Sequence, residues 1–207
     1  QRIKEKMIRP FAGTTLTDIC IKKIIDSEII DKNNFYLSLY EKELKDIANK
    51  YDVNIFNRSR ESAMSEGTPM TLMYEWWDKL PYEYCVFVNA CVPFLKTSTI
   101  ENFLQKYAES ESDGMFGVIE KKNYFWDSNG NILTPLIEDV MNTKTVQKTY
   151  EAAHCLYAGK LDKIGNNIWM GDFKTPGDIE LFPLDEEECI DIDYEWQFQL
   201  CEKLYEK

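Results

Sequence analysis

The chain has 207 residues, which suits a single domain with a full hydrophobic core. Its 24 Lys and Arg against 36 Asp and Glu give a net charge of −12, which excludes general nucleic-acid binding because that function needs a basic face. A hydrophobic content of 44% excludes disorder, and the longest mostly apolar run, residues 85–95, is about half the roughly 20 residues of a membrane helix, so no membrane partner is expected.

Helix-like and strand-like patterns alternate along the first 119 residues. Residues 15–25 carry apolar side chains at helical spacing, and Thr14 or Thr15 can cap that helix. Residues 84–88 are almost continuously apolar, which is typical of a strand covered on both faces. This alternation favours a largely parallel sheet flanked by helices, with ligands at the carboxyl ends of the strands. Helices are predicted at 15–25, 42–50, 70–80 and 97–110, and strands at 35–39, 52–56, 84–88 and 114–119.

The pattern changes after Ile119. Residues 124–133 predict a hairpin around the turn Asn129-Gly130. The polar stretch 135–150 fits no regular element. The remaining predicted elements are a strand at 152–158 and a closing helix at 194–205.

Six cysteines are scattered without a Cys-x-x-Cys pair. Most lie in apolar stretches, so we expect reduced core residues in a cytoplasmic protein. The first residues show no apolar stretch like that of a signal peptide. The single histidine, His154, excludes a histidine-rich zinc site and leaves little basis for a Ser-His-Asp triad.

Charge is concentrated at the two ends of the chain. Four basic residues against one acid lie in the first nine positions, namely Arg2, Lys4, Lys6 and Arg9 against Glu5, whereas residues 178–202 carry ten acids and no base. Each cluster alone can be a solvated face. Taken together, they fit a basic loop that holds a polyphosphate and carboxylates that hold its divalent cation.

The segment Ile190-Asp191-Ile192-Asp193 supplies a carboxylate pair. In a strand, Asp191 and Asp193 share one face while the isoleucines point into the core. Two such carboxylates repel each other unless a cation or a proton lies between them. The alternative is a pair of surface carboxylates on an edge strand.

Four segments, in order, resemble the acylneuraminate cytidylyltransferase family. Residues 1–13 resemble the second half of its N-terminal loop, 55–61 its Arg-Pro-x-Glu segment, 86–95 its apolar strand ending in Gln-Pro-Thr-Ser-Pro-Leu, and 189–195 its Ile-Asp-Ile-Asp segment. The resemblance implies one α/β Rossmann-like nucleotidyltransferase domain (glycosyltransferase-A-like) over residues 1–207. Its mostly parallel sheet is flanked by helices, with a β-hairpin insertion at 120–150 for dimerisation. Because residues 1–13 match only the second half of the loop, the family's first strand is expected to be missing.

The resemblance also implies an activity: Mg²⁺-dependent transfer of CMP from CTP to a sialic-acid-like or related sugar acid, with release of pyrophosphate. The implied catalytic residues are Arg2, Lys6, Asp191 and Asp193, of which Asp191 and Asp193 hold the metal. The implied nucleotide-binding residues are Gln1, Arg2, Lys6, Arg58, Thr68 and Asn89, with Lys4 and Arg9 as further candidates for the triphosphate. The candidate acceptor-binding residues are His154, Lys144 and Lys148.

Simpler roles remain open for some of these residues: a helix cap for Thr68, a backbone-bonded Asn89 and a core His154. The chain also departs from the family pattern, since Gln1 replaces a lysine and Glu151-Ala152-Ala153-His154 replaces Arg-Pro-Asn-Gly. The lost arginine is the natural partner of an acceptor carboxylate. Two alternatives therefore remain. The protein could be a nucleotidyltransferase that uses another NTP or a non-sugar acceptor, or it could be a non-catalytic member of the family that acts as a binding module.

Overall fold

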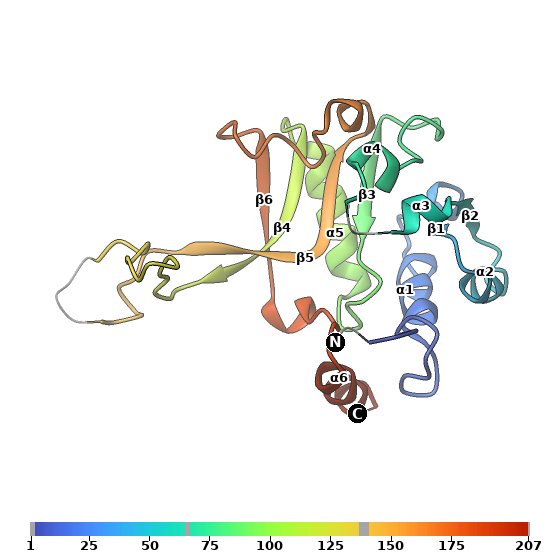
Figure 1. Cartoon of the computed structure of the whole chain (residues 1–207), viewed down its shortest axis with the longest axis horizontal. Helices are drawn as coiled ribbons and strands as arrows, with labels where there is room; N and C mark the ends of the chain where they lie inside the picture. Colours follow the sequence, from blue (N-terminus) through green and yellow to red (C-terminus); the bar gives the residue numbers. More distant parts are fainter. Residues whose placement is uncertain (1–2, 65–66, 137–140, 207) are drawn as a thin grey trace.

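The sheet is in two parts, which lie side by side in Figure 1. The computed structural model describes residues 3–64, 67–136 and 141–206, so Gln1 and Arg2 lie outside the described residues. The elements in chain order are α1 (Leu16–Ile25), η1 (Lys32–Asn34), β1 (Tyr36–Leu39), α2 (Lys42–Ala48), β2 (Asn54–Asn57), α3 (Arg60–Ala63), α4 (Met70–Met73), β3 (Tyr84–Val88), α5 (Thr97–Glu109), β4 (Gly114–Lys121), β5 (Thr149–Lys160), η2 (Leu161–Asn166), β6 (Ile179–Leu184), η3 (Glu186–Cys189) and α6 (Glu195–Tyr205).

The described sheet is mixed, so the prediction of a mostly parallel sheet is wrong. β1 and β2 form a parallel pair, and the larger part has the order β3-β5-β4-β6. β5 runs antiparallel to both of its neighbours, whereas β6 runs parallel to β4. The reason is that the chain leaves β4, makes a long excursion and returns directly alongside it as β5, without the crossover helix that a parallel pair requires.

Helices cover the sheet through amphipathic faces. In α5, Ile100 and Phe103 are buried and pack in a core with Met115 of β4 and Leu156 of β5. Each such side chain contributes roughly 1.5–3 kcal/mol by leaving water. Of the two predicted caps for α1, Thr14 and Thr15, the structure shows Thr15, whose side chain accepts from the Asp18 N–H.

Three local predictions need correction. The helix expected at 70–80 is only the single turn of α4, followed by turns that bury Trp76 against Trp169. β3 is not covered on both faces, because Tyr84 and Phe87 are 51% and 37% exposed. Residues 190–193 are not a strand, although Ile192 is fully buried between the two half-buried aspartates.

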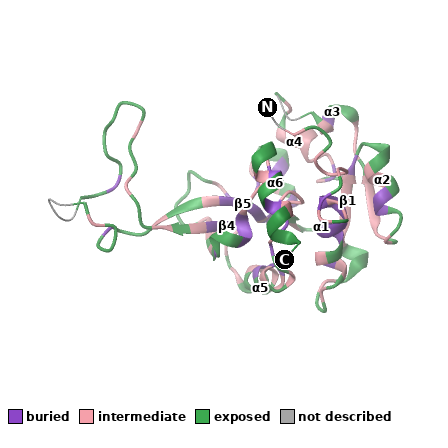
Figure 2. Ribbon diagram, turned by 90° about the horizontal axis from the view of Figure 1, so that it is seen from below, coloured by how far each residue is buried: buried purple, intermediate pink, exposed green. Residues whose placement is uncertain are grey.

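An arm projects from the body between β4 and β5 (Figure 1), and most of its surface is exposed (Figure 2). Its hairpin is reduced to one antiparallel bridge, Trp126 to Ile132, around a turn in which Gly130 has φ +83°. Only glycine adopts that conformation without strain. The backbone N–H groups of Asn129 and Asn131 both donate to Asp127 Oδ1 and close the turn.

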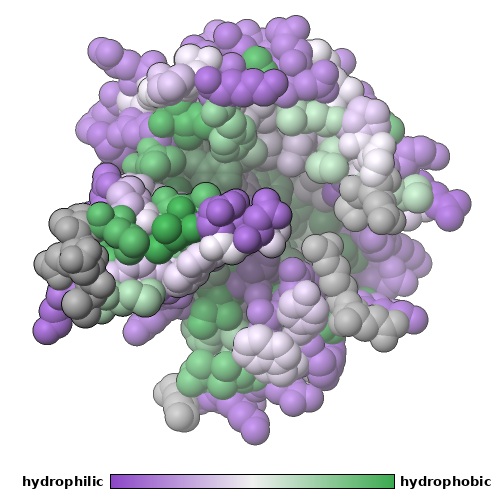
Figure 3. Space-filling view, turned by 60° about the vertical axis from the view of Figure 1, so that its left-hand side comes forward, coloured by the Kyte–Doolittle hydropathy of each residue, from purple (hydrophilic) through white to green (hydrophobic). Residues whose placement is uncertain are grey.

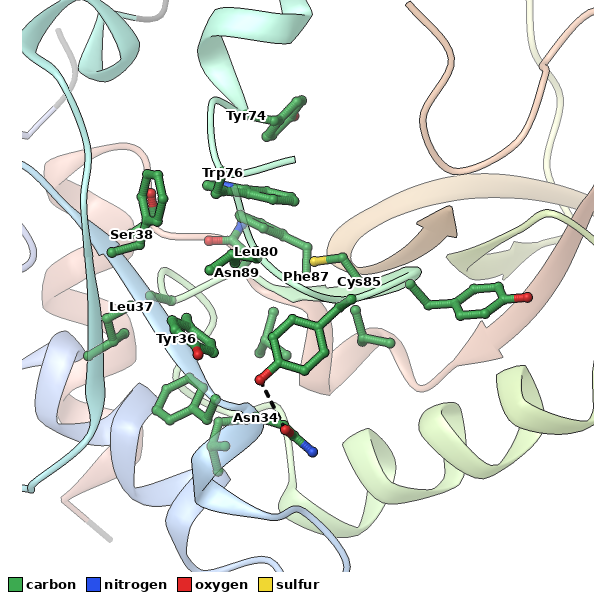
Figure 4. Close-up of a pocket in the computed structure, with 18 of the residues that line it drawn as sticks. Asn34, Tyr36, Leu37, Ser38, Tyr74, Trp76, Leu80, Cys85, Phe87 and Asn89 are labelled. Atoms are coloured by element: carbon green, nitrogen blue, oxygen red, sulfur yellow. Dashed lines mark hydrogen bonds between the residues drawn. The ribbon is translucent and has the colours of Figure 1, made fainter. Parts of the chain in front are cut away.

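A cavity of about 1320 Å³ separates the two parts of the sheet, with β1 on one side and β3 on the other. Figure 4 shows Tyr36, Leu37 and Ser38 across this space from Cys85 and Phe87. All six cysteines are free thiols, in agreement with the prediction. Among the helices formed by the described residues, none has the length and apolar character to span a membrane.

Candidate active site

The two ends of the described chain meet at the carboxyl end of β3. The Ile3 N–H donates to the Asp193 carbonyl at 3.4 Å. Arg9 makes two 2.8 Å bonds to the Glu195 carboxylate and places its guanidinium 4.4 Å from the centre of the Phe198 ring. The basic loop at residues 3–9 therefore lies against the acidic segment that follows η3, as the opposite charges of the two ends suggest.

Lys6 binds this acidic segment directly. Its Nζ donates to the Ile192 carbonyl at 2.5 Å and to Asp193 Oδ1 at 3.1 Å. Burial disfavours the ammonium, but the neighbouring Cys91, Asp193 and Asp191 outweigh burial and raise the pKa of Lys6 above its ordinary value. Lys6 therefore carries a full positive charge beside the two carboxylates.

Asp191 has an incomplete set of hydrogen bonds. Its Oδ1 is buried without a partner among the described residues, and its Oδ2 accepts from Asn89 Nδ2 at 3.4 Å. Burial raises the pKa of Asp191 despite the opposing charge of Lys6, and the negative charge of Asp193 adds to the rise. An unpartnered, desolvated carboxylate oxygen beside a second carboxylate is the donor set that a hard divalent cation satisfies.

Asn89, directly after β3, connects three parts of the site. Its Nδ2 donates to the His154 carbonyl at 2.8 Å as well as to Asp191, and its Oδ1 accepts from the Cys91 N–H at 2.9 Å. The structure therefore shows the simpler role considered for Asn89, in which backbone groups satisfy its side chain. With these bonds made, Asn89 orients Asp191 relative to β5.

The residues present fit a magnesium ion. Within the described ranges, no group of three or more His, Cys, Asp and Glu side chains is arranged to hold a metal. Two carboxylates are nevertheless available, because Asp191 and Asp193 interact with each other and with Lys6, and the remaining ligands of an ion would come from phosphate oxygens and water. This is the usual form of a Mg²⁺ site that acts on a nucleotide, because Mg²⁺ keeps several waters and takes few protein ligands.

His154 lies on the exposed side of β5 next to this site. It has φ +54° and occupies an irregular stretch where β5 loses register with β4 between Phe116 and Val118. Its Nδ1 is 3.1 Å from the Tyr157 hydroxyl, and its carbonyl accepts from Asn89 Nδ2, which also donates to Asp191. A left-handed conformation is strained in a residue other than glycine, and such bulges re-aim side chains near active sites. The core position considered for His154 does not occur.

Other predicted residues lie apart from the carboxylates. Arg58 lines the far side of the cavity, where it donates to the Ser62 carbonyl and hydroxyl, and burial lowers its pKa. The Thr68 hydroxyl donates to the Met64 carbonyl, and Pro69, not Thr68, occupies the N-cap of α4.

Two further candidates lie on the arm. Lys148 pairs with Glu120 at 2.7 Å, and the exposed Lys144 lies in the loop before β5. Gln1 and Arg2, predicted to bind the nucleotide, fall outside the described residues.

Cys91 and Tyr157 belong to the site without having been predicted there. The Cys91 Sγ lies 3.6 Å from the Met7 Sδ, and burial raises the pKa of this thiol while Lys6 opposes the rise. Tyr157 supports His154, and its pKa is raised by burial and by the charges of Cys155 and Asp191. The sequence offered one signal for Cys91, which lies two residues beyond the predicted site residue Asn89. It offered none for Tyr157, because only the irregular stretch of β5 brings this side chain into contact with His154.

Comparisons with solved structures show where this fold occurs. The 4-diphosphocytidyl-2C-methyl-D-erythritol synthase of Anaerococcus prevotii is 13% identical with a TM-score of 0.67, over 97% of this chain and 93% of that one. A CMP:2-keto-3-deoxy-manno-octonic acid synthetase complexed with CTP is 8% identical with a TM-score of 0.70, over 99% and 93%. Another 4-diphosphocytidyl-2C-methyl-D-erythritol synthase is 9% identical with a TM-score of 0.66, over 97% and 94%. At these identities the likeness shows the fold alone, an α/β nucleotidyltransferase fold.

The comparison with curated proteins gives no match. The family described as cytidylyltransferase matches residues 1–160, which is most of the chain. This match confirms the resemblance that the four sequence segments carry. The chain therefore belongs to the cytidylyltransferase family of nucleotidyltransferases.

Proposed function

We propose that this protein is a Mg²⁺-dependent enzyme that transfers CMP from CTP to a sialic-acid-like or related sugar acid and releases pyrophosphate. The observation that carries the proposal is the meeting of the Lys6 ammonium with Asp191 and Asp193 at the carboxyl end of β3. Attack on the α-phosphorus of a nucleotide requires little covalent chemistry from the protein. Positioning and neutralisation of charge dominate, and these three side chains supply both.

The metal site would use Asp191 and Asp193. When bound there, Mg²⁺ neutralises phosphate oxygens and lowers the pKa of a coordinated hydroxyl. Asn89 would hold Asp191 in place through its bonds to His154 and Cys91. Because both ends of the Asn89 amide are already bonded, this positioning role is better supported than direct reading of the cytosine.

Lys6 would bind the triphosphate, together with Arg2, and would exchange its bond to Asp193 for phosphate oxygens. Gln1, Arg58 and Thr68 remain proposed nucleotide contacts. Arg58 is already bonded to Ser62 in the cavity wall, so it would contact a nucleotide only through its remaining N–H groups.

The acceptor would lie against β5 at the exposed His154, whose carbonyl accepts from the same Asn89 amide that donates to Asp191. Lys144 and Lys148 lie on the arm. They would contribute to an acceptor site only where the arm packs on the body of a second molecule.

A homodimer through the arm is part of the proposal. The arm carries exposed apolar side chains, among them Trp126 at 51%, Leu133 at 64% and Met141 at 61%. Figure 3 shows hydrophobic side chains on the arm and around the hollow beside it. Exposed apolar groups of this size on one projecting element mark an interaction surface, and the 120–150 region would then be the dimerisation insertion.

The experiment is pyrophosphate release from CTP, ATP, GTP and UTP by the full-length protein with Mg²⁺ and a panel of sugar acids and non-sugar acceptors. CTP-only turnover with a sugar acid is the expected result, and Asp191→Asn should abolish it. Asp185→Asn is the matched control, because Asp185 is an exposed carboxylate six residues earlier in the chain. Turnover with another NTP or another acceptor would favour a different nucleotidyltransferase. CTP binding without turnover on any acceptor would favour a non-catalytic module.

A further inference from the structure

Two buried cysteines are in contact next to the candidate active site. The Cys155 Sγ, in the middle of β5, donates to the Cys189 Sγ at 3.8 Å, and the Cys189 Sγ donates to the Asp185 carbonyl at 3.3 Å. All six cysteines lie in the described part of the chain, and this is the one hydrogen-bond contact that the structure shows there between two cysteine sulfurs. A buried cysteine usually packs as a small apolar group. Burial in the same core accounts for both thiols being reduced and packed, but it does not require them to touch each other.

Each of these cysteines is joined to the candidate active site through the backbone. The Cys155 carbonyl accepts from the Asn89 N–H at 2.9 Å, and the Asn89 side chain also donates to the carbonyl of His154 and to Asp191. Cys189 is the last residue of η3 and lies two residues before Asp191. A bond between the two sulfurs therefore ties the strand that carries His154 to the segment that carries Asp191.

The two sulfur atoms need a modest approach before they can bond. A disulfide requires about 2.05 Å between its sulfurs, so the pair must close by roughly 1.8 Å. β5 is bonded to β3 on one edge and to β4 on the other, whereas η3 is a short 3-10 turn without a side-chain cap. Cys189 is therefore the partner that moves. Its movement breaks the bond to the Asp185 carbonyl and pulls on the residues that follow.

We propose that Cys155 and Cys189 form a reversible disulfide, with hydrogen peroxide as the oxidant, and that this bond displaces Asp191. Peroxide first transfers one oxygen to the Cys189 Sγ, which gives a sulfenic acid and one water. The Cys155 Sγ then attacks the sulfur of that acid, and its proton leaves with the hydroxyl as a second water. The two thiols thus give two electrons to peroxide, and a dithiol reductant returns two electrons and two protons. The effect on turnover rests on the proposed function, whereas the disulfide itself does not.

Cys189 is the sulfur that peroxide reaches first. This residue is 7% exposed, whereas Cys155 is fully buried. Residues 185–187 are exposed, so a local opening of η3 admits a small molecule without unfolding the sheet. Hydrogen peroxide carries no charge, so the acidic side chains of this segment do not repel it. The Cys155 thiol is already in contact with Cys189 and resolves the sulfenic acid where it forms.

Displacement of Asp191 weakens the candidate metal site. Within the described residues, the Asp191 carboxylate has one hydrogen bond, a long one of 3.4 Å from the Asn89 Nδ2. A pull on the segment after η3 therefore meets little resistance from this contact. Metal ligands must be held within about 0.5 Å of their productive geometry, so we expect the disulfide to lower turnover at least roughly tenfold.

Peptide mapping tests the cysteine pair. The reduced protein is treated with a small excess of hydrogen peroxide, digested without reduction and analysed by mass spectrometry. We expect one linked pair of peptides, containing Cys155 and Cys189, and recovery of both thiols with dithiothreitol. Cys189→Ala and Cys155→Ala should each abolish the linkage, whereas Cys201→Ala, which replaces another buried cysteine on α6, should keep it. Linkage between other cysteines, or no linkage at all, would overturn the proposal.

Hydrogen–deuterium exchange and pyrophosphate release test the effect on the site. The Ile192 amide, bonded to the Cys91 carbonyl at 3.1 Å, should exchange at least roughly tenfold faster in the disulfide form, and the amides of Leu16–Ile25 in α1 should serve as the unchanged reference. Turnover should fall with oxidation and return with dithiothreitol in the wild type and in Cys201→Ala, but stay constant in Cys189→Ala.

A disulfide form with unaltered Ile192 exchange and unaltered turnover would overturn the link to Asp191. Absence of turnover in the reduced protein, with every nucleotide and acceptor, would instead contradict the proposed function. In that case the peptide map and the exchange of the Ile192 amide still decide whether Cys155 and Cys189 form a disulfide that moves this segment.

Discussion

Replacing Asp191 by asparagine is expected to abolish turnover and to stabilise the protein. The fold buries this carboxylate, leaves its Oδ1 without a partner and raises its pKa. When no metal ion is bound, the negative charge of Asp191 therefore lowers the stability of the folded protein. Asparagine has almost the same shape and carries no charge, so it removes the cost of the charge together with the metal ligand.

The magnitude follows from the contacts of Asp191. An unsatisfied buried polar group costs roughly 1–3 kcal/mol, and more when it is charged. The asparagine oxygen can still accept from Asn89, but its NH₂ group then takes the place of the unpartnered Oδ1 and stays unsatisfied, so we expect a gain in the free energy of unfolding near the low end, about 1 kcal/mol. For a protein of this size, that raises the Tm by roughly 2–4 °C.

The assay combines pyrophosphate release with thermal unfolding measured in EDTA. Asp185→Asn, in the same acidic region but exposed, should change the free energy of unfolding by less than about 0.5 kcal/mol and keep its turnover. A variant at Asp191 that retains wild-type turnover would refute the metal role. A variant that unfolds at a lower Tm in EDTA would refute the reasoning about the unpartnered carboxylate.

Three further variants test other parts of the structure. Burial opposes the charge of Glu188, but the ammonium and backbone N–H of Lys96 outweigh it and hold the pKa of Glu188 below its ordinary value. The stabilisation is therefore fully present above about pH 4.5 and is lost progressively as the pH falls through the lower pKa of the folded state, so Glu188→Gln should cost roughly 1.5–3 kcal/mol in urea unfolding at pH 7 and progressively less below pH 4.5. Gly114→Ala should destabilise by roughly 1–3 kcal/mol or more in the same assay, because its Cβ would lie 2.0 Å from the Met170 carbonyl; an unchanged midpoint would contradict this packing. Leu133→Glu on the arm should convert a dimer to a monomer in light scattering with the Tm of the monomer retained, and a surviving dimer would exclude the arm as the interface.

Elements with a clear period were predicted from the sequence within a few residues. The helix α1, with its Thr15 cap, and the apolar strand β3 are examples. β6 was missed because Pro183 interrupts its apolar pattern, and proline is tolerated in an edge strand such as β6, where the missing N–H can face away from the ladder. The helix predicted at 70–80 is longer than the observed α4, because the burial of Trp76 against Trp169 overrides helix propensity in this segment.

The candidate site was predictable where charge decides and unpredictable where backbone geometry decides. Lys6, Asp191 and Asp193 come together, and the opposite charges of the two chain ends gave that signal. The bonds of Asn89 depend on the carbonyl of His154, which is turned by the irregular stretch of β5. No spacing in the sequence encodes that turn, so the positioning of Asp191 had to come from the structure.

The contact between the first and last segments has a consequence for biosynthesis. Besides the bonds of Lys6 and Arg9, the Ala12 N–H donates to Glu202 on α6 at 3.2 Å, so residues almost the full length of the chain apart hold one another. A ribosome releases α6 after every other helix and strand described for this chain. In a nascent polypeptide, the basic loop can therefore reach its partners on α6 only after that helix has emerged, and α6 at the same time brings Phe198 and Cys201 to the core cluster around Phe11.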